Sequence, residues 1–202
     1  MVTYKVGIVG VKPLLMNPAS IEMLEDIKSR KRKPVVLDES PEQEAGKKII
    51  RNDGRQAGIP DDAVGLPQEY LLACLTAAGK WVKFDARRNM SSTTESLVPA
   101  LLDIEESFFP FPTLDGGTEL PWKVDKRRGV NPQTNGANLI IRPMYENWSF
   151  EFTLSFDEKE LSEETVKDLV AKAGKRVGLG DYRPARKGPF GKFVIRAWEK
   201  VI

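Results

Sequence analysis

The residues best suited to chemistry lie close together near the end of the chain, in a glycine-rich loop that spans residues 178–193. Its four glycines are Gly178, Gly180, Gly188 and Gly191, and two prolines lie among them. Glycine permits backbone conformations and close approaches that a Cβ atom would forbid, and proline fixes its own φ angle. A flexible coil does not need both residue types, so we expect a loop of defined shape.

Cations and aromatic rings are interleaved in this glycine-rich loop, which has a single acid, Asp181. The side chains that we expect to bind nucleic acid are Tyr182, Arg183, Arg186, Lys187 and Lys192. Open backbone amides, cations and aromatic faces together suit a phosphate-bearing polymer. The rings of Tyr182, Phe190 or Phe193 would then stack on bases or brace the loop. Two alternatives stay open, namely a tight connection with solvated charges and a site for a small phosphorylated ligand.

A second basic group lies in a long excursion at residues 111–137, which is rich in Gly, Pro, Asn and Asp. An excursion of this length within a compact domain is usually functional or disordered. We interpret its cations Lys126, Arg127 and Arg128 as a binding finger that makes a second contact with the nucleic acid, with a solvated loop as the alternative. The basic run at residues 29–33 is, in the same way, either a binding arm or a loop.

Missing residue types restrict the chemistry. Histidine is absent, which removes the commonest general base and metal ligand, and Cys74 is the only cysteine. A single thiol excludes internal disulfides and thiolate zinc sites. We therefore expect no catalytic residue, no metal and no cofactor, and a binding protein rather than an enzyme. A nuclease that uses Asp, Glu, Tyr or Lys is the alternative, although no paired carboxylates indicate one.

The distribution of charge is more informative than its sum. The net charge is only +2, from 31 basic and 29 acidic residues. Acids concentrate at residues 22–62 and 151–168, whereas bases concentrate at 28–33, 123–128 and 176–200, and this segregation favours a basic face. No signal peptide or membrane-spanning run is evident, so we expect a soluble cytoplasmic protein without a membrane partner.

Hydrophobic periodicity predicts the elements that must position these residues. Alternation predicts strands at residues 2–11 and 148–156, and shorter strands near 100–104, 138–142 and 193–198. Apolar stripes predict helices at 67–79 and 162–174. The first would begin with Pro67 and end at Gly79, and the second would have Ser162 as its N-cap and end at Gly174.

Two strand–helix–strand units of this kind make an α+β, ferredoxin-like (RRM-like) βαββαβ fold. Two helices then cover one face of an antiparallel sheet and leave the other face open. We expect a single domain over residues 1–202, with insertions at about 17–58 and 111–137. Single-stranded nucleic acid commonly binds the open face of such a sheet, or the loops that border it.

Three stretches resemble the RAMP superfamily of CRISPR-associated RNA-binding proteins. Residues 51–60, with an Asp-Gly turn and an Ile-Pro pair, and the helix at 65–75 are similar to one segment of that family. The glycine-rich loop is similar to its C-terminal loop, and the strand that leads to Pro13 is similar to its first strand. The resemblance implies a modified RRM fold and RNA as the partner, commonly a guide gripped along its backbone by repeated subunits. The histidine that RAMP endonucleases often use is missing.

We therefore expect a non-enzymatic protein that grips single-stranded RNA along its backbone, as the guide of a CRISPR-type antiviral complex, and that associates with itself along the strand. A phage or mobile-element single-stranded-DNA-binding protein is one alternative. A metal-dependent nuclease and a scaffolding subunit that binds only protein are the others.

Overall fold

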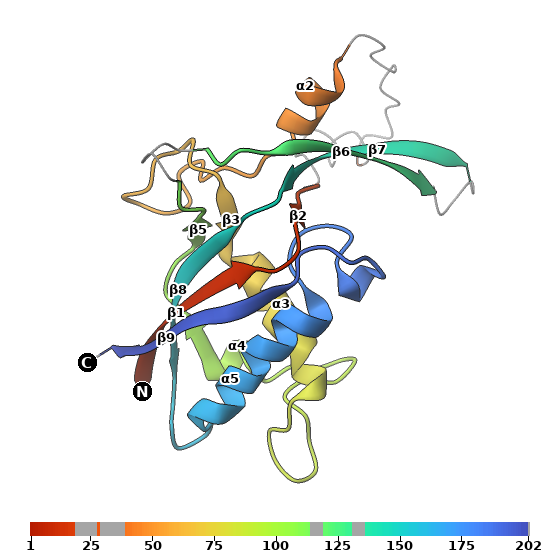
Figure 1. Ribbon diagram of the computed structural model, residues 1–202. Coiled ribbons are helices and arrows are strands. Elements are labelled where there is room, and N and C mark those ends of the chain that lie inside the picture. Colours follow the sequence, from red (N-terminus) through yellow and green to blue (C-terminus); the bar gives the residue numbers. More distant parts are fainter. Residues whose placement is uncertain (19–27, 29–38, 114–118, 131–135, 202) are drawn as a thin grey trace.

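A four-stranded antiparallel sheet lies at the centre of the molecule (Figure 1). The structure is a computed structural model that describes residues 1–18, 28, 39–113, 119–130 and 136–201. In spatial order the strands are β4 (Leu102–Ile104), β8 (Ser149–Phe156), β1 (Val2–Gly10) and β9 (Phe193–Val201). The basic run at residues 29–33 lies outside the described residues.

The alternating pattern of the two central strands places their apolar side chains in the core. Tyr4, Val6 and Ile8 of β1 are all buried, and so are the phenylalanines of β8. On the opposite face of the sheet, Thr3 is partly exposed and Lys5 is exposed. The strands predicted at 2–11 and 148–156 are confirmed, because period-two alternation fixes both the strand and its buried face.

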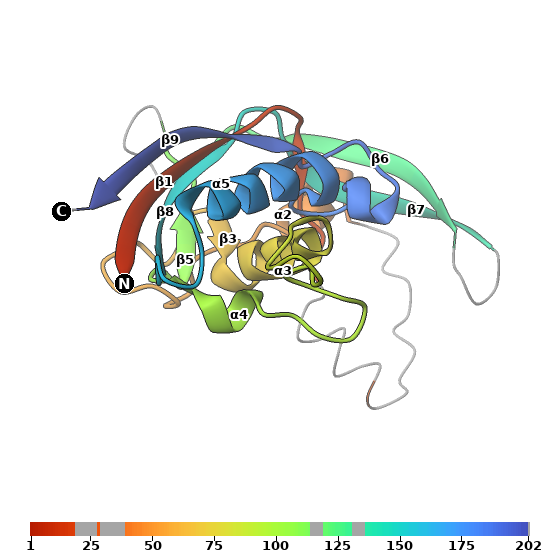
Figure 2. The ribbon, with the colours of Figure 1, turned by 90° about the horizontal axis from the view of Figure 1, so that it is seen from below.

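Helices α3 (Gln68–Ala78) and α5 (Glu163–Lys172) both lie on the same face of this sheet (Figure 2). Their apolar stripes face the sheet and supply much of the core; the buried residues are Leu71, Cys74, Leu75 and Ala78 of α3, and Val166, Leu169 and Val170 of α5. Ser162 is the N-cap of α5, since its side chain accepts a hydrogen bond from the amide of Thr165.

Two of the predicted helix ends are wrong. Pro67 is the last residue of strand β3 and the N-cap of α3, and it lies outside the helix. Gly174 does not end α5, because the chain continues through a wide turn of π-helix at Ala173–Val177. The helix ends at Gly178, whose φ of 74° leaves the helical region. This wide turn leads directly into the glycine-rich loop.

A second sheet projects from the core and contains the region predicted as a long loop excursion (Figure 1). Its strands are β2 (Leu14–Leu15), β7 (Ala137–Tyr145) and β6 (Lys123–Val130), in that order, and helix α2 (Pro41–Gly46) packs on β7. The prediction of a loop at 123–130 is wrong. The sequence of β6 has no apolar alternation, so its strand depends on backbone pairing with β7.

Shorter elements complete the fold. They are β3 (Gly65–Pro67) and β5 (Phe108–Pro110), which pair with each other, the helix α4 (Val98–Leu101), and the 3₁₀ turns Gly79–Trp81 and Pro184–Arg186. The Asp-Gly turn is confirmed, since Asp53 and Gly54 have φ angles of 46° and 74°. Every helix in the described part of the chain is too short or too polar to cross a membrane.

Candidate nucleic-acid interface

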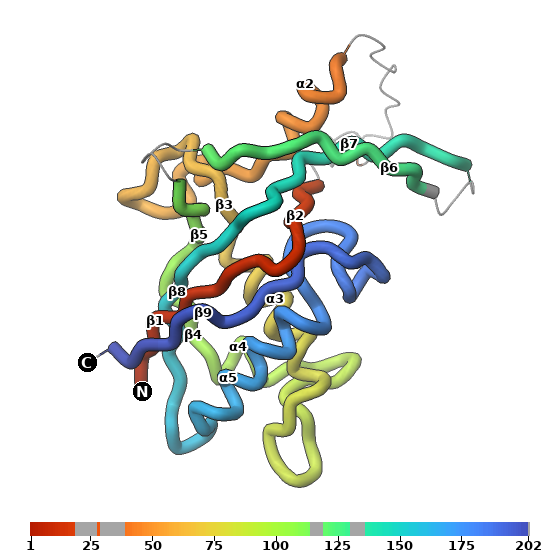
Figure 3. Tube along the Cα trace, in the orientation of Figure 1, coloured from red at the N-terminus to blue at the C-terminus, as the bar shows by residue number. Residues whose placement is uncertain are grey.

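The glycine-rich loop connects the wide turn after α5 to β9, and it lies against the chain segment that contains β2 (Figures 1 and 3). The amide of Asp181 donates to the carbonyl of Leu15 at 2.7 Å, and the amide of Gly191 donates to the carbonyl of Pro13 at 2.8 Å. These backbone bonds hold the middle and the end of the loop, so the expectation of a defined shape is confirmed.

The glycines of the loop meet conformational and steric demands that a larger residue does not. Gly178, Gly180 and Gly191 have φ angles of 74°, 72° and 66°. A Cβ atom on Gly191 would lie 1.8 Å from the carbonyl oxygen of Leu179. A Cβ atom on Gly188 would lie 1.7 Å from a backbone oxygen as well, although its φ is ordinary. The loop therefore packs against itself at backbone distance.

Two non-glycine residues of the loop also adopt left-handed conformations. Tyr182 has a φ of 48°, and Lys187, which ends the 3₁₀ turn, has a φ of 61°. This conformation costs a non-glycine residue about 1–3 kcal/mol and is common at ligand-binding sites. Tyr182 is 38% exposed, and the centroid of its ring lies 6.0 Å from that of the Phe190 ring.

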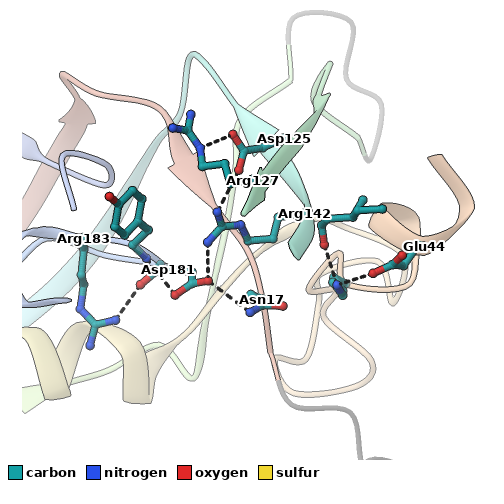
Figure 4. A network of polar contacts seen from close by, with 11 residues as sticks. Asn17, Glu44, Asp125, Arg127, Arg142, Asp181 and Arg183 are labelled. Carbon is teal, nitrogen blue, oxygen red and sulfur yellow. Dashed lines mark hydrogen bonds and ion pairs between the residues drawn. The ribbon is translucent and has the colours of Figure 1, made fainter. Parts of the chain in front are cut away.

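A network of ion pairs connects this loop to the β6–β7 hairpin (Figure 4). Arg142 of β7 donates to Asp181 of the loop at 2.7 Å and to Asp125 of β6 at 2.9 Å. Arg127 donates to the other oxygen of Asp125 at 2.7 Å, and the side-chain amide of Asn17 donates to Asp181 at 3.2 Å. The side chains of Arg142 and Asp125 are only 4% and 5% exposed. A buried cation is therefore neutralised by two carboxylates.

Asp181 is ionised in this arrangement. Burial by itself would raise the pKa of its carboxyl group. The hydrogen bonds from Arg142, from the amide of Tyr182 and from Asn17 outweigh burial, so the pKa of Asp181 lies below its ordinary value. The one acid of the loop is thus directed inward, toward Arg142, and its charge is compensated there.

The two predicted basic segments meet, but only through one of the three finger cations. The guanidinium of Arg127 lies 4.7 Å from the centroid of the Phe190 ring, across the gap between hairpin and loop. Lys126 and Arg128 lie on the opposite face of β6, because side chains alternate along a strand. The three cations therefore do not share one face of the hairpin, and their role as a second contact with nucleic acid stays a prediction.

The cations of the glycine-rich loop differ in how accessible they are to a ligand. Arg186 and Lys187 are exposed, and among the described residues neither has a carboxylate or ring partner. Arg183 is half-buried, and its guanidinium donates to the carbonyl of Gly180 at 2.6 Å. Lys192 is also half-buried. Arg186 and Lys187 are therefore the cations that most readily reach a ligand.

The aromatic residues of the loop divide in the same way. Phe190 and Phe193 are 8% and 2% exposed, so they brace the loop from inside. Tyr182 is the one aromatic residue of the loop with an exposed ring. Of the two roles expected for the rings, stacking is geometrically available to Tyr182 alone.

The expectation of open backbone amides is wrong for most of the loop. Amides that donate to backbone carbonyls include those of Gly178, Leu179, Asp181, Arg186, Lys187, Gly188, Phe190 and Gly191. A phosphate cradled by backbone N–H groups needs such amides to be free. Any phosphate bound at this loop would therefore be contacted mainly by side chains.

Sequence reasoning missed Arg142, Asp125 and Asn17 as parts of this interface. The signal that could have found them is Asp181, because a lone acid within a cationic loop suggests a cation partner elsewhere. Cys74 has a structural role here: its thiol donates to the carbonyl of Gly178 at 3.3 Å, and burial raises its pKa to about 12. In the described part of the chain, no three His, Cys, Asp or Glu side chains cluster in a way that could hold a metal ion.

No family model matches this chain, and no curated protein matches it. The functional interpretation therefore depends on the chain's own residues and their geometry.

Proposed function

We propose that the chain is a non-enzymatic protein that binds single-stranded nucleic acid, with RNA favoured, through the glycine-rich loop. One observation carries this proposal. The loop presents Arg186, Lys187 and the ring of Tyr182 to solvent, while its only acid, Asp181, is paired inward with Arg142. The outer surface of the loop is consequently cationic and aromatic, which is the combination that binds phosphates and bases.

The contacts would be made in a form that tolerates any base sequence. Arg186 offers a planar fork of donors that matches two oxygens of a phosphate, and Lys187 offers a compact charge. Tyr182 offers one ring face, and every base has a π-face that can stack on it. Arg183 and the ion pairs of Arg142 hold the loop in shape and contribute indirectly.

The architecture supports a ferredoxin-like, RRM-like core. Numbered along the chain, the strands of the central sheet have the spatial order 4-1-3-2, with α3 after the first strand and α5 after the third. This order is compatible with two interleaved strand–helix–strand units. It is compatible with the resemblance to the RAMP superfamily, and membership of that superfamily is part of our proposal, as is self-association along the strand.

Binding to labelled oligonucleotides of one sequence, made as RNA and as DNA, tests the proposal. We expect fluorescence anisotropy to rise with protein for RNA at least as strongly as for DNA, and denaturing gels to show intact oligonucleotide with and without Mg²⁺. Magnesium-dependent cleavage would instead indicate the nuclease. Tighter binding of DNA would indicate the single-stranded-DNA-binding alternative, and binding of neither would indicate a scaffolding subunit. Sedimentation with and without oligonucleotide tests self-association.

A further inference from the structure

A second cationic surface lies beside the C-terminal end of α5, outside the residues considered so far. We call it the Trp81 surface, and it consists of residues 80–89 and 168–176. These two segments contain seven Lys or Arg residues and two Asp residues, which leaves +5, whereas the whole chain has a net charge of only +2. This surface is therefore strongly cationic, although neither segment as a whole stood out in the sequence patterns.

The two segments form one surface through contacts with Trp81. The ammonium group of Lys172 donates to the carbonyl of Trp81 at 2.7 Å. The guanidinium of Arg176 lies 5.4 Å from the centroid of the indole ring. Trp81 is 42% exposed, although its neighbour Val82 is buried in the core. A large aromatic ring is thus held at the surface among cations.

The segment after Trp81 folds back on itself, with an antiparallel bridge between Lys83 and Asn89. The amide of Met90 donates to the carbonyl of Val82 at 2.8 Å, and Met90 is fully buried. At the tip, the carboxylate of Asp85 accepts the amides of Arg87 and Arg88, both at 2.8 Å. These bonds lower the pKa of Asp85, so its carboxylate is ionised and its charge is compensated by groups of its own segment.

The remaining acid of this surface is also paired, and several cations are not. Asp168 accepts from Lys172 at 2.6 Å. Cations without a carboxylate or ring partner among the described residues are Lys80, Lys83, Arg87 and Lys175, and all four are exposed. A cationic surface whose acids are both paired attracts a polyanion.

We propose that the Trp81 surface is a second binding surface for the same single-stranded nucleic acid, with a base on Trp81 and phosphates on Lys80, Lys83 and Lys175. This inference depends on the proposed function of the glycine-rich loop and extends it. Arg176 lies in the wide turn that runs directly into Gly178, so the chain connects the two surfaces without an intervening element. An acidic protein would use the cations but would not need the ring, whereas base stacking uses both.

Salt dependence of binding tests the cations. The variant Lys80→Ala/Lys175→Ala removes one exposed cation from each segment. With an oligouridylate of about 20 nucleotides, we expect the slope of log affinity against log salt to become shallower by about 1.4, at about 0.7 per phosphate contact. The control Lys159→Ala/Lys200→Ala removes two exposed lysines that belong neither to the Trp81 surface nor to the glycine-rich loop, and its slope should equal that of the wild type.

Fluorescence tests the ring. A base stacked on Trp81 should quench part of the tryptophan emission of the wild type during titration with the oligouridylate. Trp81→Phe keeps a stacking ring, so it should retain affinity within about threefold while this quenching is lost. Trp81→Leu should weaken binding by about tenfold, since stacking on one aromatic contributes at least that order. Unchanged circular dichroism shows that each variant is folded.

The outcomes separate this inference from the proposed function. If the wild type binds and Arg186→Ala/Lys187→Ala weakens binding, but Lys80→Ala/Lys175→Ala and Trp81→Leu match the wild type, the Trp81 surface is not a binding surface. If only the Trp81-surface variants weaken binding, the inference holds and the role given to the glycine-rich loop is wrong. If the wild type binds no oligonucleotide, both proposals are overturned.

Discussion

Replacement of Arg142 by methionine tests the ion-pair network that holds the glycine-rich loop. Methionine has a similar length but no charge. The change leaves the buried Asp125 with Arg127 as its one remaining cation in the network, and Asp181 without its closest partner. The side chain of Asp125 is 5% exposed, and water cannot compensate its charge well. Removal of one partner from a buried ion pair costs about 3–5 kcal/mol of unfolding free energy.

Urea unfolding, followed by tryptophan fluorescence, measures this loss. With a denaturant slope of about 2 kcal/mol/M, we expect the midpoint of Arg142→Met to fall by about 2 M. Arg128→Met is the matched control, because Arg128 lies in the same hairpin but is exposed. Its unfolding free energy should change by less than about 0.5 kcal/mol.

A functional readout accompanies the stability measurement. Arg142 is buried and does not reach a ligand, yet it fixes Asp181 and hence the loop. Under conditions where Arg142→Met is folded, we therefore expect weaker oligonucleotide binding than for the wild type. If Arg142→Met lost less than about 1 kcal/mol of unfolding free energy, or if Arg128→Met lost as much, the network would not be what holds the loop.

Three further predictions concern the same loop. In Arg186→Ala/Lys187→Ala, the slope of log affinity against log salt should become shallower by about 1.4, and the melting temperature should not fall. An unchanged slope would mean that these two cations do not contact the nucleic acid. Gly191→Val should abolish or severely reduce the unfolding transition in calorimetry, because a Cβ atom at this position would clash with the backbone of Leu179. Gly46→Ala is the control and should melt like the wild type, because no atom lies within 4 Å of the added Cβ. The pKa of Asp181 is lower in the folded protein than in the unfolded chain, so its ionised carboxylate stabilises the folded state. This contribution is complete above the unfolded pKa of about 3.9 and is lost as the pH falls through the pKa of the folded state. Melting temperatures of the wild type should therefore fall more steeply below about pH 4 than those of Asp181→Asn, and parallel curves would contradict this.

The sequence by itself determined the elements whose signals are local. Period-two alternation identified β1 and β8, and apolar stripes identified α3 and α5, because burial of one face requires those spacings. The glycines of residues 178–193 identified a shaped loop for the same kind of reason, since the backbone conformation of a residue depends on its own Cβ. These features can be read without knowledge of what lies nearby in space.

Only the tertiary structure decided which charged side chains are exposed to a ligand and which are neutralised by an ion-pair partner. Asp125, Arg142 and Asp181 are far apart in the sequence and come together only when the hairpin packs on the loop. The pairing of β6 with β7, which the charged sequence of β6 does not signal, also placed Arg127 on one face and Lys126 on the other. Long-range pairing and burial determine the partner of an ion, and neither is encoded in the spacing of neighbouring residues.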